Sequence, residues 1–430
     1  MKKAAFYTLG CKVNQYETQA MTELFSNSGY DICDFDSYAD VYVINTCTVT
    51  AMSDRKSRQI IRRAKKNNPN SIIIVTGCYA QTNPDAVKKI DGVNLIVGTS
   101  DRKNIVSLCE SLGPDTISCH IGDIMKNHSF EDLQISKYEE RTRAYIKIQE
   151  GCNQFCSYCI IPYARGPIRS RDEEEILAET KKLVKNGYTE IIYTGIHIAS
   201  FGLDKGKERL ADFLCKANEI DGLERIRLSS IEPMTLNTEF TNKIKDCSKL
   251  CHHFHLSLQS GCDETLKRMN RKYTTEQYKK IVEDLRTLYP DVAITTDIMT
   301  GFPGETDEEF SKTLEFVNEI QFADAHIFQY SPRNGTPAAK RDDQVAPYLK
   351  EERSKKLIEV CARSRDNFIS SFIGKEMCVL FEQPIKGFFE GKTSNYITVY
   401  VKSDINLQGQ YKKVVIDKCD NGIAYAHIIE

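Results

Sequence analysis

The first hundred residues repeat one pattern, a short apolar run followed within two residues by a cysteine. The runs span residues 4–9, 41–45 and 72–76, and the cysteines are Cys11, Cys47 and Cys78. Helical stretches come next, at residues 15–27 and 53–67, so the elements alternate as β-α-β-α. This order predicts a parallel sheet of the α/β class, in which the carboxyl ends of the strands meet at one edge.

These three cysteines are therefore expected to lie together. A single cysteine at the end of a strand is unremarkable, and three buried core thiols are the simplest alternative. Three cysteines in the same local position instead favour a shared metal site at the edge where ligands gather in such sheets. The site has one protein ligand fewer than a closed cluster takes, and nearby helix N-termini would favour an anionic cluster there.

A second group of cysteines has the spacing C-x3-C-x2-C and comprises Cys152, Cys156 and Cys159. Residues 145–148 are typical of a strand, so this group falls on the loop that follows it. The spacing alone is compatible with an iron–sulfur cube that leaves one iron open, with a zinc site whose fourth ligand is distant, or with buried thiols.

The length of 430 residues indicates two to four domains. We expect an N-terminal domain over residues 1–120, a linker over 121–137, a central domain over 138–368 and a C-terminal domain over 371–430. The central domain alternates strands and helices, which predicts six β/α units in an open relative of the (β/α)8 barrel. Its strands are expected at residues 144–149, 190–194, 225–228, 254–258, 293–298 and 325–329.

The C-terminal segment contains five short strand-like runs with turn residues between them, which predicts a small antiparallel β-barrel. Its seven Lys balance seven Asp and Glu, and it has no Arg. The segment therefore lacks the basic surface that usually accompanies nucleic-acid binding.

The clearest basic feature is a stripe on the helix that follows Cys47. Its residues recur at helical spacing and are Arg55, Arg58, Arg62 and Lys65. Such a stripe is most often a solvated helix face, but its place beside a predicted metal ligand makes it a candidate for contacting an RNA backbone. Arg165 and Arg169, just past the second cysteine group, are further RNA-binding candidates.

The C-x3-C-x2-C group resembles the motif of the radical S-adenosylmethionine (SAM) enzymes. The resemblance implies that Cys152, Cys156 and Cys159 hold a 4Fe-4S cluster whose open iron binds SAM, which is cleaved to a 5′-deoxyadenosyl radical. Tyr158 would then lie against the adenine of SAM. The resemblance also implies that loops after the barrel strands line a pocket for SAM or substrate, with Gly195, Ser229, Glu232, Gln259 and Asp297 as its candidate residues.

The two cysteine groups in this order resemble the methylthiotransferases, a radical SAM family that covers essentially the whole chain. The similar segments are TLGCKVN at residues 8–14, NTC at 45–47 and TGCYAQ at 76–81. The resemblance implies that Cys11, Cys47 and Cys78 hold a second 4Fe-4S cluster that carries the sulfur. One SAM would supply the radical and another the methyl group, and the C-terminal barrel would be a TRAM-like RNA-binding module.

The run LGCKVNQYET at residues 9–18 resembles the branch that acts on N6-threonylcarbamoyladenosine in tRNA. The expected reaction places a methylthio group at C2 of that base at position 37. The alternatives are isopentenyladenosine in tRNA or an aspartate of a small-subunit ribosomal protein. The resemblance implies an anticodon stem-loop as substrate and an electron donor such as a flavodoxin or ferredoxin.

Thiolate ligands require a reducing compartment, so the sixteen cysteines favour a cytoplasmic protein over a secreted one. No run approaches the ~20 apolar residues of a membrane span, so no membrane partner is expected. We also expect a monomer.

Overall fold

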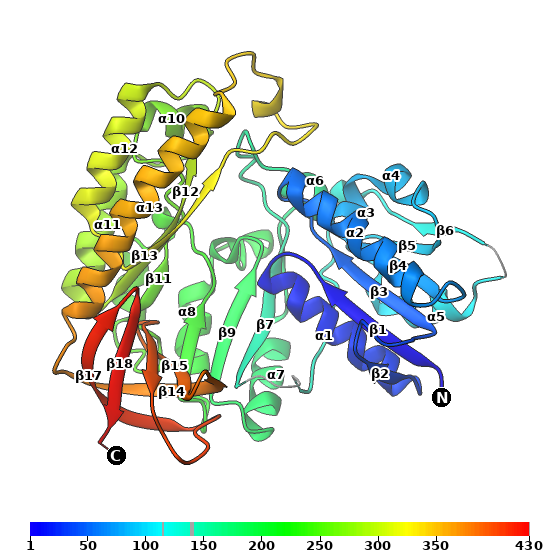
Figure 1. Cartoon of the computed structure of the whole chain (residues 1–430), viewed down its shortest axis with the longest axis horizontal. Coiled ribbons are helices and arrows are strands. Elements are labelled where there is room, and N and C mark those ends of the chain that lie inside the picture. The colour runs from blue at the N-terminus through cyan, green and yellow to red at the C-terminus, as the bar shows by residue number, and fades with distance from the viewer. Residues whose placement is uncertain (114–115, 138–141, 430) are drawn as a thin grey trace.

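The computed structural model describes residues 1–113, 116–137 and 142–429. Residues 138 and 430, where the predicted central domain begins and the predicted C-terminal domain ends, lie outside these ranges. Three regions built on β-sheets follow one another along the chain, as the colours of Figure 1 show: a six-stranded sheet, a central region made of a four-stranded and a three-stranded sheet, and a closed barrel. None of the helices in the described ranges combines the length and apolar character that crossing a bilayer requires.

The N-terminal sheet confirms the expected parallel α/β arrangement. Its strand order is β2-β1-β3-β4-β5-β6, and every pairing in it is parallel. The strands are β1 (Lys3–Thr8), β2 (Asp31–Cys33), β3 (Val41–Thr46), β4 (Ile72–Gly77), β5 (Val93–Val97) and β6 (Ser118–His120). Strands β3 and β4 are buried almost throughout, as their continuous apolar runs require.

Helix α1 (Lys12–Asn27) packs between two hydrophobic cores. Met21 and Phe25 join the core on one face of the N-terminal sheet. Tyr16 and Ala20 join the large core of the central domain instead. In Figure 1 the helix accordingly lies between the blue sheet and strand β7. Its two apolar faces bring the N-terminal domain against the central one.

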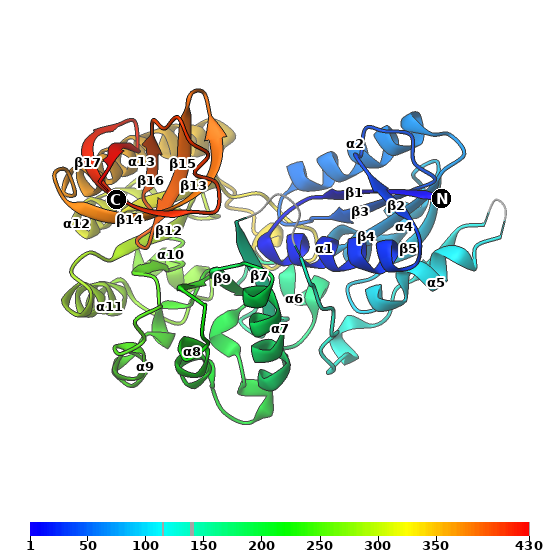
Figure 2. The same ribbon diagram turned by 90° about the horizontal axis from the view of Figure 1, so that it is seen from below.

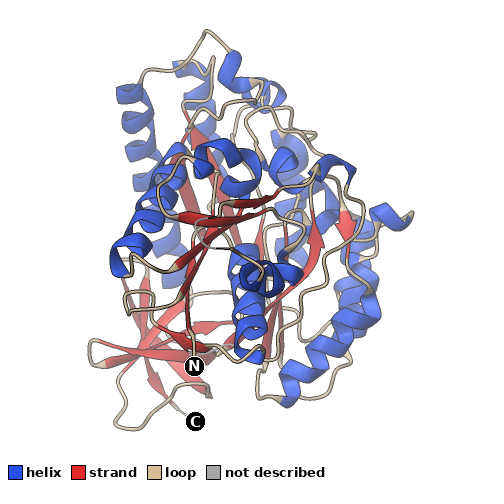
Figure 3. Cartoon of the chain, turned by 90° about the vertical axis from the view of Figure 1, so that its right-hand side faces the viewer, coloured by secondary structure: helices blue, strands red, loops and turns tan. Residues whose placement is uncertain are grey.

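The central domain is an open barrel, as predicted. Parallel pairings and two isolated bridges join six strands in sequence order: β7 (Arg143–Glu150), β9 (Glu190–Gly195), β10 (Arg225–Leu228), β11 (His253–His255), β12 (Ala293–Thr300) and β13 (Asp324–Gln329). A short strand, β8 (Arg169–Ser170), pairs antiparallel with β7. Figure 3 shows the strands inside and the helices around them. These helices include α7 (Glu173–Lys185), α8 (Leu210–Asn218), α11 (Thr275–Leu288), α12 (Asp307–Ile320) and α13 (Pro347–Ser370).

The C-terminal segment forms a closed five-stranded barrel in the order β14-β15-β16-β18-β17. Its strands are β14 (Glu376–Ile385), β15 (Phe388–Thr393), β16 (Thr398–Val401), β17 (Tyr411–Asp420) and β18 (Ile423–Ile428). The predicted small antiparallel barrel is confirmed, with one parallel pairing, between β16 and β18, that closes it. Figure 2 shows this barrel against the central domain, away from the N-terminal sheet.

Candidate active site

The structure brings Cys11, Cys47 and Cys78 to one edge of the N-terminal sheet. They follow β1, β3 and β4, which are adjacent parallel strands. Cys11 is the N-cap of α1, and Cys78 begins the short helix α3 (Cys78–Thr82). A Cβ placed on Gly10 would lie 3.0 Å from Sγ of Cys47, so the loop before Cys11 packs directly on Cys47.

Two of these cysteines are buried and Cys11 is exposed. Burial raises the pKa of the Cys47 and Cys78 thiols. In the protein alone both thiols therefore stay protonated, and a metal has to displace their protons to bind.

The second cysteine group lies on the loop between β7 and the helix α6 (Ile161–Arg165). The backbone N–H of Cys152 donates to the carbonyl of Gly166 at 3.1 Å, and that of Cys159 donates to the carbonyl of Cys156 at 2.9 Å. A Cβ on Gly151 would collide with the carbonyl of Pro167, so only glycine fits where the loop leaves β7. Burial raises the pKa of Cys152 to about 11 and that of Cys159 to about 12.

Each cysteine group offers the three thiols that an iron–sulfur cube with one open iron would need. In a cube each thiolate binds a different iron, so the three sulfurs stand farther apart than the ligands of one ion. Among the described residues no three His, Cys, Asp or Glu side chains are arranged to hold a single metal ion.

Arg271 connects the second cysteine group to Glu232. Its Nη1 donates to Sγ of Cys156 at 3.4 Å, and its Nη2 donates to Glu232 at 2.8 Å. Glu232 also lies 3.8 Å from Nε2 of His197. Tyr158 packs edge-on against Phe302, with 6.4 Å between the ring centres.

The other predicted pocket residues lie on the barrel strands or on the segments that follow them. Gly195 ends β9, and Ser229 directly follows β10. Ser229 and Gln259 are buried, and the Oγ of one and the Oε1 of the other have no partner among the described residues. Asp297, on β12, accepts from His255 at 3.2 Å and lies 3.4 Å from His326. These buried polar atoms are suited to binding a polar ligand.

The basic stripe lies on helix α2 (Ala51–Asn67), whose other face buries Ser57, Ile61 and Ala64. Arg55 and Arg62 are exposed. Arg58 and Lys65 are half-buried, with Arg58 donating to the Tyr79 hydroxyl and Lys65 to the Pro69 carbonyl. An RNA contact at this stripe stays a prediction.

Arg165 and Arg169 differ from the expectation that they extend an RNA-binding surface. Both side chains are buried, at 0% and 2% exposed. Arg169 donates to the carbonyls of Asn127 and Arg165. Two side chains that bind protein groups in the interior do not face a nucleic-acid backbone.

Arg165 instead contacts a cysteine of the first group from within the central domain. It ends α6, just past the second group, and its Nε donates to Sγ of Cys78 at 3.1 Å. Its Nη2 donates to Oδ1 of Asn14 at 2.6 Å, and its Nη1 lies 2.6 Å from Glu17 and 2.8 Å from Glu150. One guanidinium thus contacts residues of both the N-terminal and the central domain.

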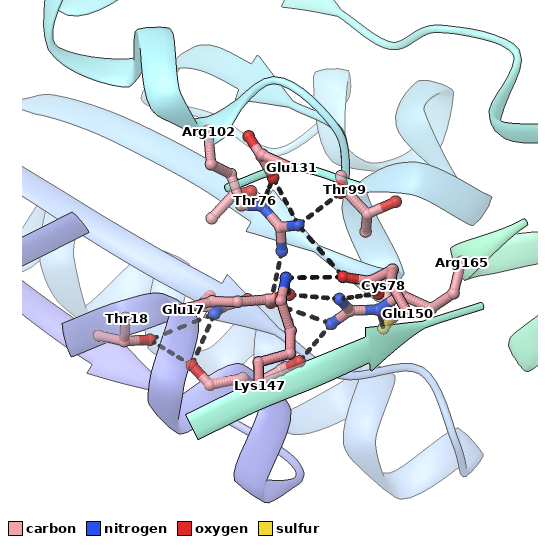
Figure 4. Close-up of polar contacts among 12 residues, drawn as sticks. Glu17, Thr18, Thr76, Cys78, Thr99, Arg102, Glu131, Lys147, Glu150 and Arg165 are labelled. Carbon is pink, nitrogen blue, oxygen red and sulfur yellow. Dashed lines mark hydrogen bonds and ion pairs between the residues drawn. The ribbon is translucent and has the colours of Figure 1, made fainter. Parts of the chain in front are cut away.

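Around Arg165 lies a buried charge network, shown in Figure 4, that the sequence did not reveal. It contains three cations and three carboxylates, namely Arg102, Lys147, Arg165, Glu17, Glu131 and Glu150. Burial opposes the charged form of Glu17, but Arg102, Arg165 and Lys147 outweigh it and lower its pKa. The only sequence signal was the presence of Lys147 and Glu150 in a buried strand, where charges need partners.

Comparisons with known proteins agree with this arrangement. Residues 146–317 match the Radical SAM superfamily, and residues 3–98 match the uncharacterized protein family UPF0004. The threonylcarbamoyladenosine tRNA methylthiotransferase MtaB of Bacillus subtilis is 43% identical over 97% of this chain and 94% of its own length. MtaB of Aquifex aeolicus is 39% identical over 96% of this chain and 98% of its own length.

Solved structures share the fold at low identity. The radical SAM methyltransferase TsrM from Kitasatospora setae superposes with a TM-score of 0.57 at 15% identity, covering 79% of this chain and 77% of TsrM. The relatives at 39% and 43% identity, similar over nearly their full length, decide the classification. The chain belongs to the radical SAM methylthiotransferase family.

Proposed function

We propose that this enzyme inserts a methylthio group at C2 of N6-threonylcarbamoyladenosine at position 37 of tRNA. The names of the relatives from Bacillus subtilis and Aquifex aeolicus support this substrate. The observation that carries the proposal is that Arg165, just past the second cysteine group, donates to Sγ of Cys78 in the first group and contacts Glu150, two residues before Cys152. The reaction requires a radical at one place and a sulfur atom at the other.

In this proposal Cys152, Cys156 and Cys159 hold the radical-generating cluster, and Cys11, Cys47 and Cys78 hold the sulfur-carrying cluster. When bound, the two 4Fe-4S clusters and SAM supply the radical, the methyl group and the transferred sulfur. Arg271 donates to Cys156, and Arg165 donates to Cys78, so one thiolate of each group would accept a charge-assisted hydrogen bond when it holds its cluster.

The chain's own residues orient and enclose the site. The buried charge network fixes α1, which begins directly after Cys11, against β7, which ends two residues before Cys152. The side chains of this charge network are almost completely shielded from water. Tyr158, Gly195, Ser229, Glu232, Gln259 and Asp297 are the proposed lining for SAM and the base.

The proposed partners are a tRNA anticodon stem-loop and an electron donor such as a flavodoxin or ferredoxin. Helix α2 offers the basic face for the RNA backbone, and the C-terminal barrel adds a TRAM-like surface. We propose that the enzyme works as a monomer.

Nucleoside analysis of tRNA from a strain lacking the gene tests the substrate. We expect loss of 2-methylthio-N6-threonylcarbamoyladenosine and accumulation of its unmodified precursor, with both reversed when the gene is returned. A C152A variant is the matched control, because it should fail to restore the product. Persistence of the product in a strain without a second such gene would refute the proposal. Loss of methylthiolated isopentenyladenosine or of a modified ribosomal protein would assign one of the alternatives instead.

A further inference from the structure

A cavity of about 450 Å³ opens between the inner face of the central barrel and the C-terminal barrel. Residues of β11, β12 and β13 form one wall, and residues around the β15–β16 turn form another. Lys12, which directly follows Cys11, also lines it. We call this space the lumen cavity. Its size is within the range of pockets that bind small organic groups.

The lumen cavity has a positive electrostatic character. Lys12 from the N-terminal domain and Lys392 from the C-terminal barrel both line it. Burial would raise the pKa of Tyr396, which also lines the cavity, but Arg143, Lys12, Lys392 and Arg227 outweigh burial and lower it. Arg143 and Arg227 are paired with Glu190, so Lys12 and Lys392 are the cations that favour a negative charge at this place.

The acidic side chains of the lining have cationic or histidine partners of their own. Asp297 is contacted by His255 and His326. Asp324 lies 3.7 Å from Arg365. Lys392 donates to the hydroxyl of Thr398 at 2.5 Å, a neutral acceptor. Within the described part of the chain, the two lysines of the cavity therefore form no ion pair with either aspartate.

The floor of the lumen cavity is a constrained turn. Tyr396 has a φ of 69°, a left-handed conformation that is rare for a bulky residue and is often found at ligand sites. The turn is fixed by Arg227, which donates to the carbonyls of Ser394 and Thr393, and by Asn395, which donates to the carbonyl of Asp291. These contacts place the Tyr396 ring flat on His253, with centres 4.6 Å apart.

His253 provides an unused polar group in this wall. It is 7% exposed, and its Nε2 bonds to Thr295 at 2.9 Å. Its Nδ1 has no partner among the described residues. A buried ring nitrogen without a partner loses free energy unless a ligand or water bonds to it.

The lumen cavity and the proposed active site have one lining residue in common. Asp297 belongs to both, and its carbonyl accepts the backbone N–H of Gln259 at 2.8 Å. Lys12 ties the cavity to the sulfur-carrying cysteines, because it is the residue after Cys11. A group attached to a base at the clusters would extend from there into this space.

We propose that the lumen cavity receives the threonylcarbamoyl group of the substrate base, with its carboxylate bound by Lys12 and Lys392. This inference rests on the proposed function and adds how the enzyme selects its substrate. The group carries one carboxylate and one hydroxyl, so it supplies both the charge and the hydrogen-bonding atoms that this polar cavity lacks. An isopentenyl group supplies neither and would leave the two half-buried ammonium groups facing an apolar group without an anion.

The test compares the wild-type protein and three lysine variants on anticodon stem-loop RNAs. The RNAs carry threonylcarbamoyladenosine, its carboxyl methyl ester or isopentenyladenosine at position 37. The variants are K392M, the charge-preserving K392R, and K386M as a control. Lys386 is an exposed residue on the β14–β15 turn of the same barrel. Iron content and RNA binding are measured beside kcat/KM for methylthiolation.

We expect K392M to lower kcat/KM on the threonylcarbamoyl RNA by about 10- to 100-fold, the usual effect of losing a hydrogen bond to a charged group. Its activity on the methyl ester should equal that of the wild type, because that substrate has already lost the charge. K392R should recover most of the loss, and K386M should match the wild type. If K392M does not fold, the wild-type protein alone tests the inference, because its kcat/KM should be lower on the methyl ester than on the acid.

Two results would overturn the inference alone. One is a wild-type protein that uses the ester as well as the acid. The other is a K392M variant whose kcat/KM falls equally on all three RNAs, which would show that Lys392 contacts an RNA phosphate instead. If the wild-type protein does not methylthiolate threonylcarbamoyl RNA but does methylthiolate isopentenyl RNA, the proposed function and the inference are both overturned.

Discussion

The guanidinium of Arg165 donates a hydrogen bond from Nε to Sγ of Cys78 over 3.1 Å, although the two residues belong to different domains. The same side chain bonds to Asn14 and to the carboxylates of Glu17 and Glu150. The planar guanidinium of an arginine carries donors on three nitrogen atoms and bonds to several separated acceptors at once. A lysine has a single ammonium nitrogen and does not span the same acceptors. Arg165 is thus a positioning residue that sets one cysteine group relative to the other.

Arg165→Lys separates positioning from charge balance. The variant retains the cation against Glu17 and Glu150 but loses the hydrogen bond to Cys78. We expect turnover to fall by about tenfold or more, in line with the loss of a charge-assisted hydrogen bond, with iron content unchanged. Electron paramagnetic resonance should show an altered spectrum for the N-terminal cluster. Arg63→Lys is the control, because Arg63 pairs with Asp36 at the surface. Wild-type turnover and spectrum in the Arg165 variant would contradict the assignment.

Removing one charge from the buried network should destabilise the fold. Glu17→Gln leaves Arg102, Arg165 and Lys147 without their shared carboxylate. Breaking a buried ion pair on one side costs about 3–5 kcal/mol. Urea denaturation should show this loss in the free energy of unfolding. Glu110→Gln, at an exposed site on the same domain, should change it by less than about 0.5 kcal/mol.

The two cysteine groups predict a stepwise loss of iron. Anaerobically reconstituted protein should contain roughly eight irons per chain, because each cube has four. Cys47→Ala should reduce this to roughly four, and adding Cys156→Ala should remove the rest. Cys109→Ala is the matched control, because Cys109 is equally buried but lies in the core of the N-terminal sheet. Eight irons in the Cys47 variant would exclude Cys47 as a ligand.

Glu208 should make stability depend on pH. Burial and the nearby Glu239 raise its pKa to about 7. Because the folded pKa exceeds the unfolded value of about 4.3, the folded state loses stability as pH rises between these two values. Glu208→Gln should therefore stabilise the protein by about 1–2 kcal/mol at pH 8, discounted for partial exposure, and by much less at pH 5. Equal stabilisation at both pH values would show that charge is not the cause.

The basic stripe of α2 predicts a salt-dependent contact with RNA. Arg55→Ala combined with Arg62→Ala removes two exposed cations. Each lost phosphate contact should reduce the slope of log affinity against log salt by about 0.7–0.9. Fluorescence anisotropy with an anticodon stem-loop measures this slope. Lys181→Ala, exposed on α7, should leave it unchanged.

Much of the fold could be predicted because its strands are apolar runs. The sequence placed β3, β4 and β10 to within a residue at each end, since each forms a short buried segment. It did not reveal β2 or β6, which are three-residue edge strands formed by pairing with a neighbour. Strand β11 is shorter than predicted because, beyond His255, its ladder with β12 is reduced to one isolated bridge between Gln259 and Ile298.

The candidate site was predicted less completely. The cysteines were identifiable because their positions follow from motif spacing and from the shared edge of a parallel sheet. Arg165 and Arg169 were expected to extend an RNA-binding surface because they lie just past the second cysteine group in the sequence. Their burial depends on carboxylates far away in the chain, such as Glu17, and on the packing of α1 against β7. Local patterns do not contain such tertiary partners.

Helix α1 carries a consequence for how such enzymes could be recombined. Tyr16 and Ala20 are part of the central core, while Met21 and Phe25 are part of the N-terminal core. Neither domain can then be transferred by itself. Separating the two domains would expose one apolar face of this helix, and it would leave the buried carboxylate of Glu17 without the cations that pair with it. A chimaera of two relatives would need to exchange α1 and β7 together, so these two segments are expected to evolve as a pair.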